Sequence, residues 1–188
     1  SYKYQGVTFY FIDNEYYFAR NGLYGHYDDG ERFAFFSKAA IDTLGYVDFF
    51  PDVLHAHDWQ AALSIIYLKT LYSDRFRFSE IKTVFTIHNI EYQGKYGTEN
   101  LQDLFGLPEY CTPYVTYDGC INLMKGAIVY SNHTTTVSPT YSREIKNAYF
   151  AHGLEYCTNM YGYKISGILN GIDTDLYSAE KDDKIIAN

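Results

Sequence analysis

Short apolar runs alternate along this chain with longer stretches in which apolar residues recur at helical spacing. The runs are rich in β-branched and aromatic residues, which favours strands. Strands are predicted at residues 7–13, 52–58, 82–89, 133–138 and 164–170. Helices are predicted at residues 32–44, 59–72, 98–106, 120–131 and 138–147. Residues 20–31, which hold several glycines, are expected to form a loop.

Residues with known preferences for helix ends stand at several of these boundaries. Gly45 is expected to stop the first predicted helix. Thr98 is expected to cap the helix that ends at Gly106. Ser138, followed by a proline, is expected to cap the last predicted helix. The order of elements therefore predicts an α/β fold: a doubly wound, mostly parallel sheet with helices on both faces.

Polar side chains follow three of the predicted strands. Asp58 follows the second, His88 and Asn89 end the third, and Asn170 and Asp173 follow the last. Parallel sheets bind ligands at the carboxyl ends of their strands, so a site is expected where these residues gather.

The stretch "HAHDW" (55–59) allows several interpretations. A His-x-His pair at a strand end is how some metal-dependent hydrolases begin, but no third histidine follows closely. His55 and His57 are otherwise expected to be buried strand residues bonded to backbone, with Trp59 in the core. Asp58 can cap the next helix or accept a hydrogen bond from a substrate hydroxyl. Asn89 can form a turn or line a sugar site.

Composition narrows the possible functions. The 188 residues carry a formal net charge of −8, which argues against a nucleic-acid partner. The 22 tyrosines suit a carbohydrate surface, although codon bias explains such an excess equally well. Cys111, Cys120 and Cys157 lack metal-type spacing and are expected to be free thiols in a reducing compartment. No apolar run is long enough to predict a membrane span.

The chain begins without a methionine and ends in a polar stretch, so we expect it to be a piece of a longer protein. Residues 1–178 are expected to form part of one domain. Residues 179–188 are expected to be a polar tail that leads toward an interdomain linker.

Five stretches in order carry a resemblance to a known family: "DDGERFAFFSKAAID", "HAHDWQAAL", "KTVFTIHNIEYQGKYG", "TTTVSPTYSREI" and "SGILNGID". They resemble the N-terminal catalytic domain of bacterial glycogen synthases and plant starch synthases, over about residues 7 to 178. The resemblance implies a Rossmann-like domain of a GT-B glycosyltransferase. It also implies transfer of glucose from ADP-glucose to the non-reducing end of an α-1,4-glucan with retention, and no metal or other cofactor.

The resemblance also implies roles for individual residues. Asp58 and His88 are similar to the family's glucose-contacting pair, and Asn89 is similar to a residue of the same pocket. Further substrate contacts are implied, less directly, for five residues: Tyr24, Tyr92, Gln93, Asn122 and Lys125. "YFAHGLE" (149–155) resembles a loop near the acceptor, and "NGID" (170–173) resembles the exit toward the interdomain hinge.

Several departures limit what this chain is expected to do alone. Gln60 stands where the family usually has histidine. The family's Lys-x-Gly-Gly-Leu loop would lie before Ser1, and the C-terminal domain with its pyrophosphate-binding cations is absent. We therefore expect the chain alone to be inactive. A non-catalytic carbohydrate-binding protein and a metal-dependent hydrolase remain the alternatives. A cytoplasmic location in a bacterium, or a plastid in a plant, is expected.

Overall fold

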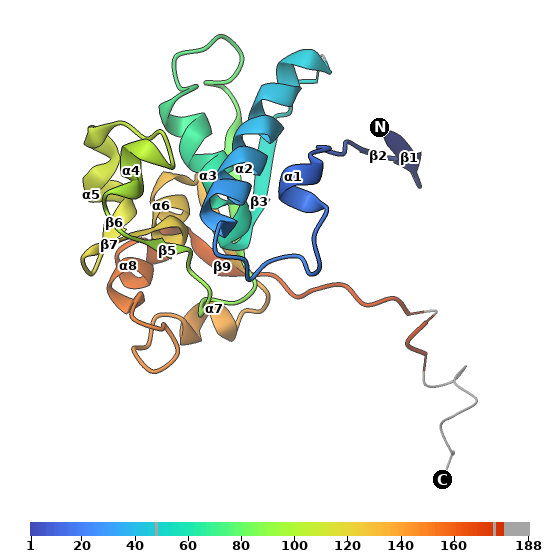
Figure 1. Ribbon diagram of the computed structural model, residues 1–188. Helices are drawn as coiled ribbons and strands as arrows, with labels where there is room; N and C mark the ends of the chain where they lie inside the picture. Colours follow the sequence, from blue (N-terminus) through green and yellow to red (C-terminus); the bar gives the residue numbers. More distant parts are fainter. Residues whose placement is uncertain (48, 175, 179–188) are drawn as a thin grey trace.

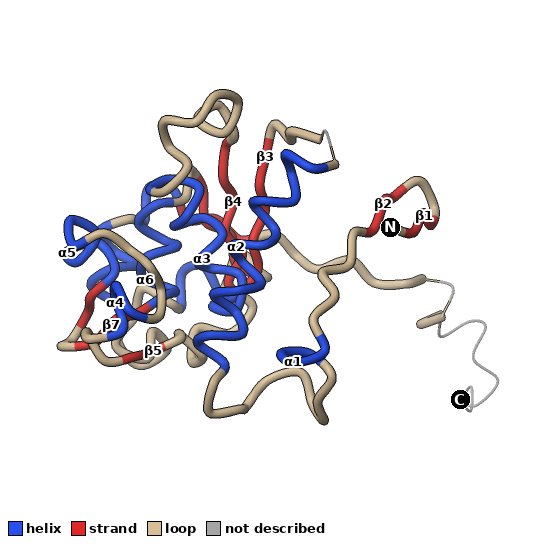
Figure 2. The backbone as a smooth tube through the Cα atoms, turned by 45° about the horizontal axis from the view of Figure 1, so that its top comes forward, coloured by secondary structure: helices blue, strands red, loops and turns tan. Residues whose placement is uncertain are grey.

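The computed structural model describes residues 1–47, 49–174 and 176–178, and a four-stranded parallel sheet forms the centre of this part of the chain (Figures 1 and 2). The strands pair in the order β3-β4-β8-β9. Their bounds are Val53–His57 (β3), Lys82–Ile87 (β4), His133–Thr136 (β8) and Ile165–Gly167 (β9). The predicted α/β fold with a mostly parallel sheet is confirmed.

Helices connect these strands, and one of the longest packs directly on the sheet. The main helices are α2 (Asp29–Tyr46), α3 (Asp58–Thr70) and α6 (Leu123–Tyr130). The shorter ones are α1 (Glu15–Phe18), α4 (Asn100–Asp103), η1 (Glu109–Cys111), α5 (Thr112–Val115), α7 (Tyr141–Glu144), α8 (Glu155–Met160) and η2 (Gly162–Lys164). Helix α3 packs on β3 and β4 and is flanked by α2 and α6. It is therefore buried almost all round, as a helix inside a core must be.

Two small sheets lie outside the central one. β5 (Lys95–Tyr96), β7 (Cys120–Asn122) and β6 (Thr116–Tyr117) form an antiparallel sheet with β7 in the middle. β1 (Tyr2–Tyr4) and β2 (Val7–Phe9) form a hairpin that stands away from the body (Figure 1). The strand predicted at residues 7–13 therefore ends early, because only residues 7–9 find a pairing partner.

Other predicted boundaries also need correction. Gly45 lies inside α2, which continues to Tyr46, so it does not stop the helix. Residues 120–122, predicted as helix, form β7 because they pair with β5 and β6. Helix α4 is shorter than predicted, and no side chain caps it, so Thr98 does not act as the predicted cap. Ser138 Oγ does accept a hydrogen bond from Tyr141 N–H, as a cap at the start of a helix does. Residues 179–188 lie outside the described part of the chain.

One face of the central sheet packs into the core and carries buried threonines beside its apolar side chains, whereas the other face is mostly polar. Side chains alternate along a strand, so Leu54 and Ala56 of β3 share the face that carries Phe85 and Ile87 of β4, and these pack into the core. The other face carries mostly polar side chains: His55, His57, Thr86, His133, Thr135 and Ser166. β3 is at the edge of the sheet, and His55 and His57 are exposed, so the expectation that both are buried is wrong.

Two further predictions concern the cysteines and a membrane-spanning helix. Cys111, Cys120 and Cys157 are free thiols, as predicted. Among the described residues, no helix combines the length and the apolar character needed to cross a bilayer.

Helices α3 and α6 approach closely at one point. Gly126 of α6 faces Ile66 of α3, and a methyl group added to this glycine would lie 2.7 Å from Ile66 Cδ1. Ile66 itself is completely buried. The packing of the two helices therefore depends on a small residue against a large one.

Ile66→Ala should lower the free energy of unfolding by about 2–5 kcal/mol, because the side chain leaves a cavity between two helices. Urea denaturation followed by circular dichroism measures this. Ile168→Ala is the matched control: Ile168 is 63% exposed, so its truncation should change stability by less than about 0.5 kcal/mol. Equal losses in both variants would contradict the packing described here.

Candidate active site

The parallel pairing of β3 and β4 brings two distant segments together at one edge of the sheet. His57, the last residue of β3, pairs with Thr86, close to the end of β4. Asp58 and His88 therefore follow their strands at the same end. Asp58 Oδ1 accepts a hydrogen bond from His88 N–H at 2.8 Å and a longer one from Asn89 N–H at 3.5 Å. The acid and the histidine segment therefore meet, but through the backbone of His88, and the predicted convergence of the two side chains on a substrate stays a prediction.

Asp58 does not cap the helix that it begins. Its backbone has a φ of +55°, in the left-handed region that a residue with a side chain rarely adopts. No side chain caps α3 at its N-terminus, since His57 at the cap position makes no such hydrogen bond. The carboxylate turns instead toward the segment after β4, which it holds by its N–H groups. The simple capping interpretation of Asp58 is therefore wrong.

A small hollow of about 200 Å³ lies beside this bond. It is lined by Tyr24, Asp58, Trp59, Gln60, Asn89 and Tyr92. The structure thus brings together Asp58, Asn89, Tyr24 and Tyr92 of the predicted site. Asn89 also forms a turn, because its Oδ1 accepts a hydrogen bond from Glu91 N–H at 3.0 Å. Trp59 is 8% exposed and packs edge-on against Phe33, so it is a core residue that also forms part of the wall of the hollow. Asn170 and Asp173, which were expected at the same edge of the sheet, are not among the residues that line this hollow.

Three other residues predicted to contact substrate are held inside the domain. Asn122 is completely buried: its Nδ2 donates to Gln93 Oε1 at 2.7 Å, and its Oδ1 accepts from Lys125 N–H at 2.9 Å. Gln93 Nε2 donates to the carbonyls of Ile90 and His152. These two side chains connect the loop after β4 to the start of α6. Gln93 and Asn122 do not line the hollow beside Asp58, and their predicted contact with substrate stays a prediction.

Lys125 is engaged in a similar way. Its Nζ donates to the carbonyls of Pro113 and Thr116, at 2.7 and 2.8 Å. Burial lowers the pKa of this ammonium group. The Lys125 ammonium group is hydrogen-bonded to backbone carbonyls around α5 and β6, so Lys125 does not line the hollow.

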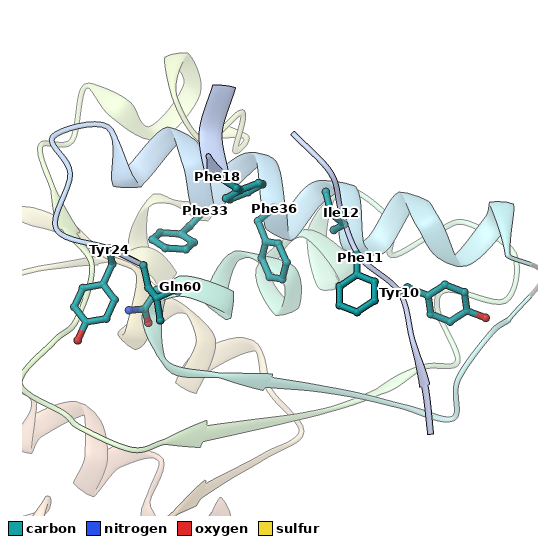
Figure 3. A pocket seen from close by; sticks show the side chains of 9 residues that line it. Tyr10, Phe11, Ile12, Phe18, Tyr24, Phe33, Phe36 and Gln60 are labelled. Carbon is teal, nitrogen blue, oxygen red and sulfur yellow. The ribbon is translucent and has the colours of Figure 1, made fainter. Parts of the chain in front are cut away.

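A second hollow, more apolar and of about 470 Å³, adjoins the first (Figure 3). The two share Tyr24 and Gln60. Its other walls come from the N-terminal segment, α1, the following loop and α2: Tyr10, Phe11, Ile12, Phe18, Leu23, Phe33 and Phe36. This hollow could not be predicted from the local sequence pattern, which indicates a strand at residues 10–12.

The imidazoles at the edge of the sheet interact with one another. His57 Nδ1 lies 3.0 Å from His88 Nε2, and His55 Nε2 lies 2.6 Å from Thr86 Oγ1. Burial lowers the pKa of both His55 and His57, and the neighbouring imidazoles lower these pKa values further; for His57, nearby Asp58 acts in the opposite direction. Among the described residues, no group of three or more histidine, cysteine or acidic side chains is arranged to hold a metal ion.

The sequence of this chain is similar to those of starch synthase catalytic domains and glycogen synthases. The family model for the starch synthase catalytic domain matches residues 1–160. A glycogen synthase of Streptococcus agalactiae serotype Ia is 50% identical over 178 residues, which are 94% of this chain and 37% of that protein. A glycogen synthase of Bacillus cereus (strain Q1) is 46% identical over 184 residues, 97% of this chain and 39% of that protein.

A solved structure is also similar. The catalytic domain of starch synthase IV from Arabidopsis thaliana, bound to ADP and acarbose, matches with a TM-score of 0.79 and 37% identity. The match covers 89% of this chain and 35% of that one. The present chain thus spans less than two fifths of the length of these relatives.

Asn122→Ala should lower the free energy of unfolding by about 1–3 kcal/mol, because it removes the cap of α6 and leaves Gln93 Oε1 without its buried donor. Chemical denaturation measures this. Asn89→Ala is the control, since Asn89 is exposed and should cost less. Wild-type stability of the Asn122 variant would contradict the structural role that these hydrogen bonds assign to the residue.

The lowered pKa values of His55 and His57 predict a pH dependence of stability. The unfolded chain protonates these imidazoles near the ordinary pKa of 6.5, whereas the folded chain does so only at lower pH. The unfolded state therefore binds more protons in that interval, and the free energy of unfolding should fall as the pH drops below 6.5.

Urea denaturation at pH 7.5 and 5.5 measures this dependence. The double variant His55→Asn/His57→Asn should show a smaller difference between the two pH values. An equal difference in the double variant would assign the pH dependence to other groups.

Proposed function

Because this chain belongs to the starch synthase catalytic domain family, we propose that it is part of a retaining glucosyltransferase. The proposed reaction transfers glucose from ADP-glucose to the non-reducing end of an α-1,4-glucan and needs no metal cofactor. The single observation that carries this proposal is the meeting of Asp58 with His88 and Asn89 beside a hollow at the carboxyl ends of β3 and β4. The glycogen synthase relatives and the ADP-bound and acarbose-bound neighbour support it.

The walls of the small hollow suit a hexose. Asp58 and Asn89 offer a carboxylate and an amide to sugar hydroxyls, and Gln60 offers a second amide. Tyr24 and Tyr92 are both more than half exposed and present aromatic rings to the same space. Aromatic rings with polar neighbours pack well against the apolar faces of sugars. We assign the donor glucose to this hollow, with Asp58 and Asn89 in its wall and His88 beside it, next to both residues in the chain fold but not among the lining residues.

The proposed chemistry makes orientation the main task of these residues. Transfer with retention passes through a cation-like sugar while negative charge develops on the departing diphosphate. No pair of carboxylates of the glycosidase kind lines the hollow, where Asp58 is the one acidic group among the described lining residues. Asp58 and His88 then act by fixing the sugar, because misplacing a reacting group costs orders of magnitude in rate.

The departing diphosphate needs positive charge that this hollow does not offer. Its described lining residues include no lysine or arginine. We propose that residues 1–178 are part of an N-terminal domain and that a second, nucleotide-binding domain supplies these cations across a cleft. The chain alone would then hold a sugar without completing the transfer.

In the full-length protein, Asp58→Ala and His88→Ala should each lower turnover by about 100-fold or more, because the donor glucose loses its fixed orientation. Transfer of labelled glucose from ADP-glucose to maltooligosaccharide measures this. Asp52→Ala is the matched control: Asp52 is exposed and precedes β3, at the opposite end of the strand from Asp58. It should leave turnover within about two-fold of the wild type.

Near-normal turnover in both site variants would show that the site is elsewhere. The same assay on the 188-residue chain should give no transfer. Full turnover by this chain would contradict the proposed need for a second domain.

A further inference from the structure

We propose that His57 is a positioning residue that fixes the ring of His88, whose backbone N–H is bonded to Asp58 in the wall of the proposed sugar site. The inference deepens the proposed function and rests on it for the role of His88. The resemblance assigns a role to His88 and Asp58 and none to His57. The structure nevertheless gives His57 a direct contact with the His88 side chain.

The geometry places the two rings edge to edge across neighbouring strands. His57 is the last residue of β3, and His88 follows the end of β4. His57 Nδ1 lies 3.0 Å from His88 Nε2, which is hydrogen-bonding distance. The backbone of His88 is held independently, since its N–H donates to Asp58 Oδ1 at 2.8 Å. His88 is thus fixed at two points, its main chain by Asp58 and its ring by His57.

His57 is itself supported by a row of side chains on the polar face of the sheet. Its ring lies against the ring of His55, with centroids 4.2 Å apart and planes inclined by 32°. His55 Nε2 lies 2.6 Å from Thr86 Oγ1, which lies 2.6 Å from Thr135 Oγ1. Both threonines are nearly buried, at 7% and 5% exposure. This row of side chains crosses β3, β4 and β8. The exposed ring of His57 is therefore supported by contacts that lead to buried threonines of the sheet.

The bond between the rings constrains protons as well as positions. Burial lowers the pKa of His57, and His55 and His88 lower it further, while Asp58 opposes them. A neutral imidazole carries one N–H, so one ring donates in this bond and the other accepts. When His88 is also neutral, the state of its Nε2 decides whether its Nδ1 is a donor or an acceptor. The bond therefore couples the tautomer of His88 to that of His57, and with it what the free nitrogen of His88 can offer to a sugar hydroxyl.

Nitrogen-15 NMR of the histidine rings tests this directly on the 188-residue chain. At pH 7.5 the two ring nitrogens of His88 should show the well-separated shifts of one dominant tautomer. His57→Phe keeps a flat ring against His55 but removes the nitrogens, and the two shifts of His88 should move together as the tautomers mix. His57→Asn keeps a polar atom near the position of Nδ1 and should preserve most of the separation.

His133→Phe is the matched control. His133 lies on the same face of the sheet, on β8, and its Nε2 is 2.8 Å from Ser166 Oγ, so its ring is bonded away from His88. This variant should leave the His88 shifts unchanged. If His57→Phe does not fold, His57→Ala provides the same readout. Unchanged His88 shifts in a folded variant that lacks the His57 nitrogens would overturn the inference.

Turnover of the full-length protein separates this inference from the proposed function. His57→Phe should lower kcat about 10-fold while KM for the glucan stays within about two-fold, and His57→Asn should recover most of the loss. Reduced turnover in His88→Ala together with wild-type kcat in His57→Phe would refute the positioning role and leave the proposed function standing. Near-normal turnover in His88→Ala, together with the expected NMR shifts, would refute the proposed role of His88 in the transfer and support the contact between the rings.

Discussion

The parallel pairing of β3 with β4 is the constraint on which the site depends. It makes the two strands end at the same edge, so that residues 30 positions apart in the sequence come within one hydrogen bond. A slip of one residue would turn His55 and His57 into the core and bring Ala56 to the polar face. The apolar side chains of Leu54, Phe85 and Ile87 oppose that slip, because they are packed beneath the sheet. The core thus sets the register, and the register places the site.

The bond from Asp58 to His88 N–H also accounts for an unusual backbone. A residue with a side chain in the left-handed region costs of the order of 1–3 kcal/mol, and Asp58 has a φ of +55°. A hydrogen bond to a charged group contributes about 1.5–3 kcal/mol, which is of similar size. The strained turn is therefore sustained by the contact that it makes possible. Strain of this kind is typical of functional sites, where the surrounding structure fixes a conformation that the local sequence does not prefer.

The sequence predicted the parts of the fold that depend on local pattern. The ends of β3 and β4 follow from apolar runs, and Asp58, His88 and Asn89 follow from their place after those runs. The strand β7 could not be predicted, because its pairing with β5 and β6 is not local and the stretch from Cys120 onward reads as helix. The burial of Asn122 against Gln93 was hidden for the same reason: the two residues are 29 positions apart, and each alone resembles a surface amide.

The polar face of the central sheet is unusual for a parallel sheet. Parallel sheets are usually covered on both faces and apolar on both, whereas here histidine, threonine and serine occupy one face of β3, β4, β8 and β9. Such side chains carry a desolvation cost unless each finds a partner, and the observed pairs of His55 with Thr86 and His133 with Ser166 meet that need. This polar pairing lets the sheet bring imidazoles to its edge without leaving buried polar atoms unbonded along those strands. The stability of the sheet and the orientation of the sugar-site histidine therefore draw on the same set of hydrogen bonds.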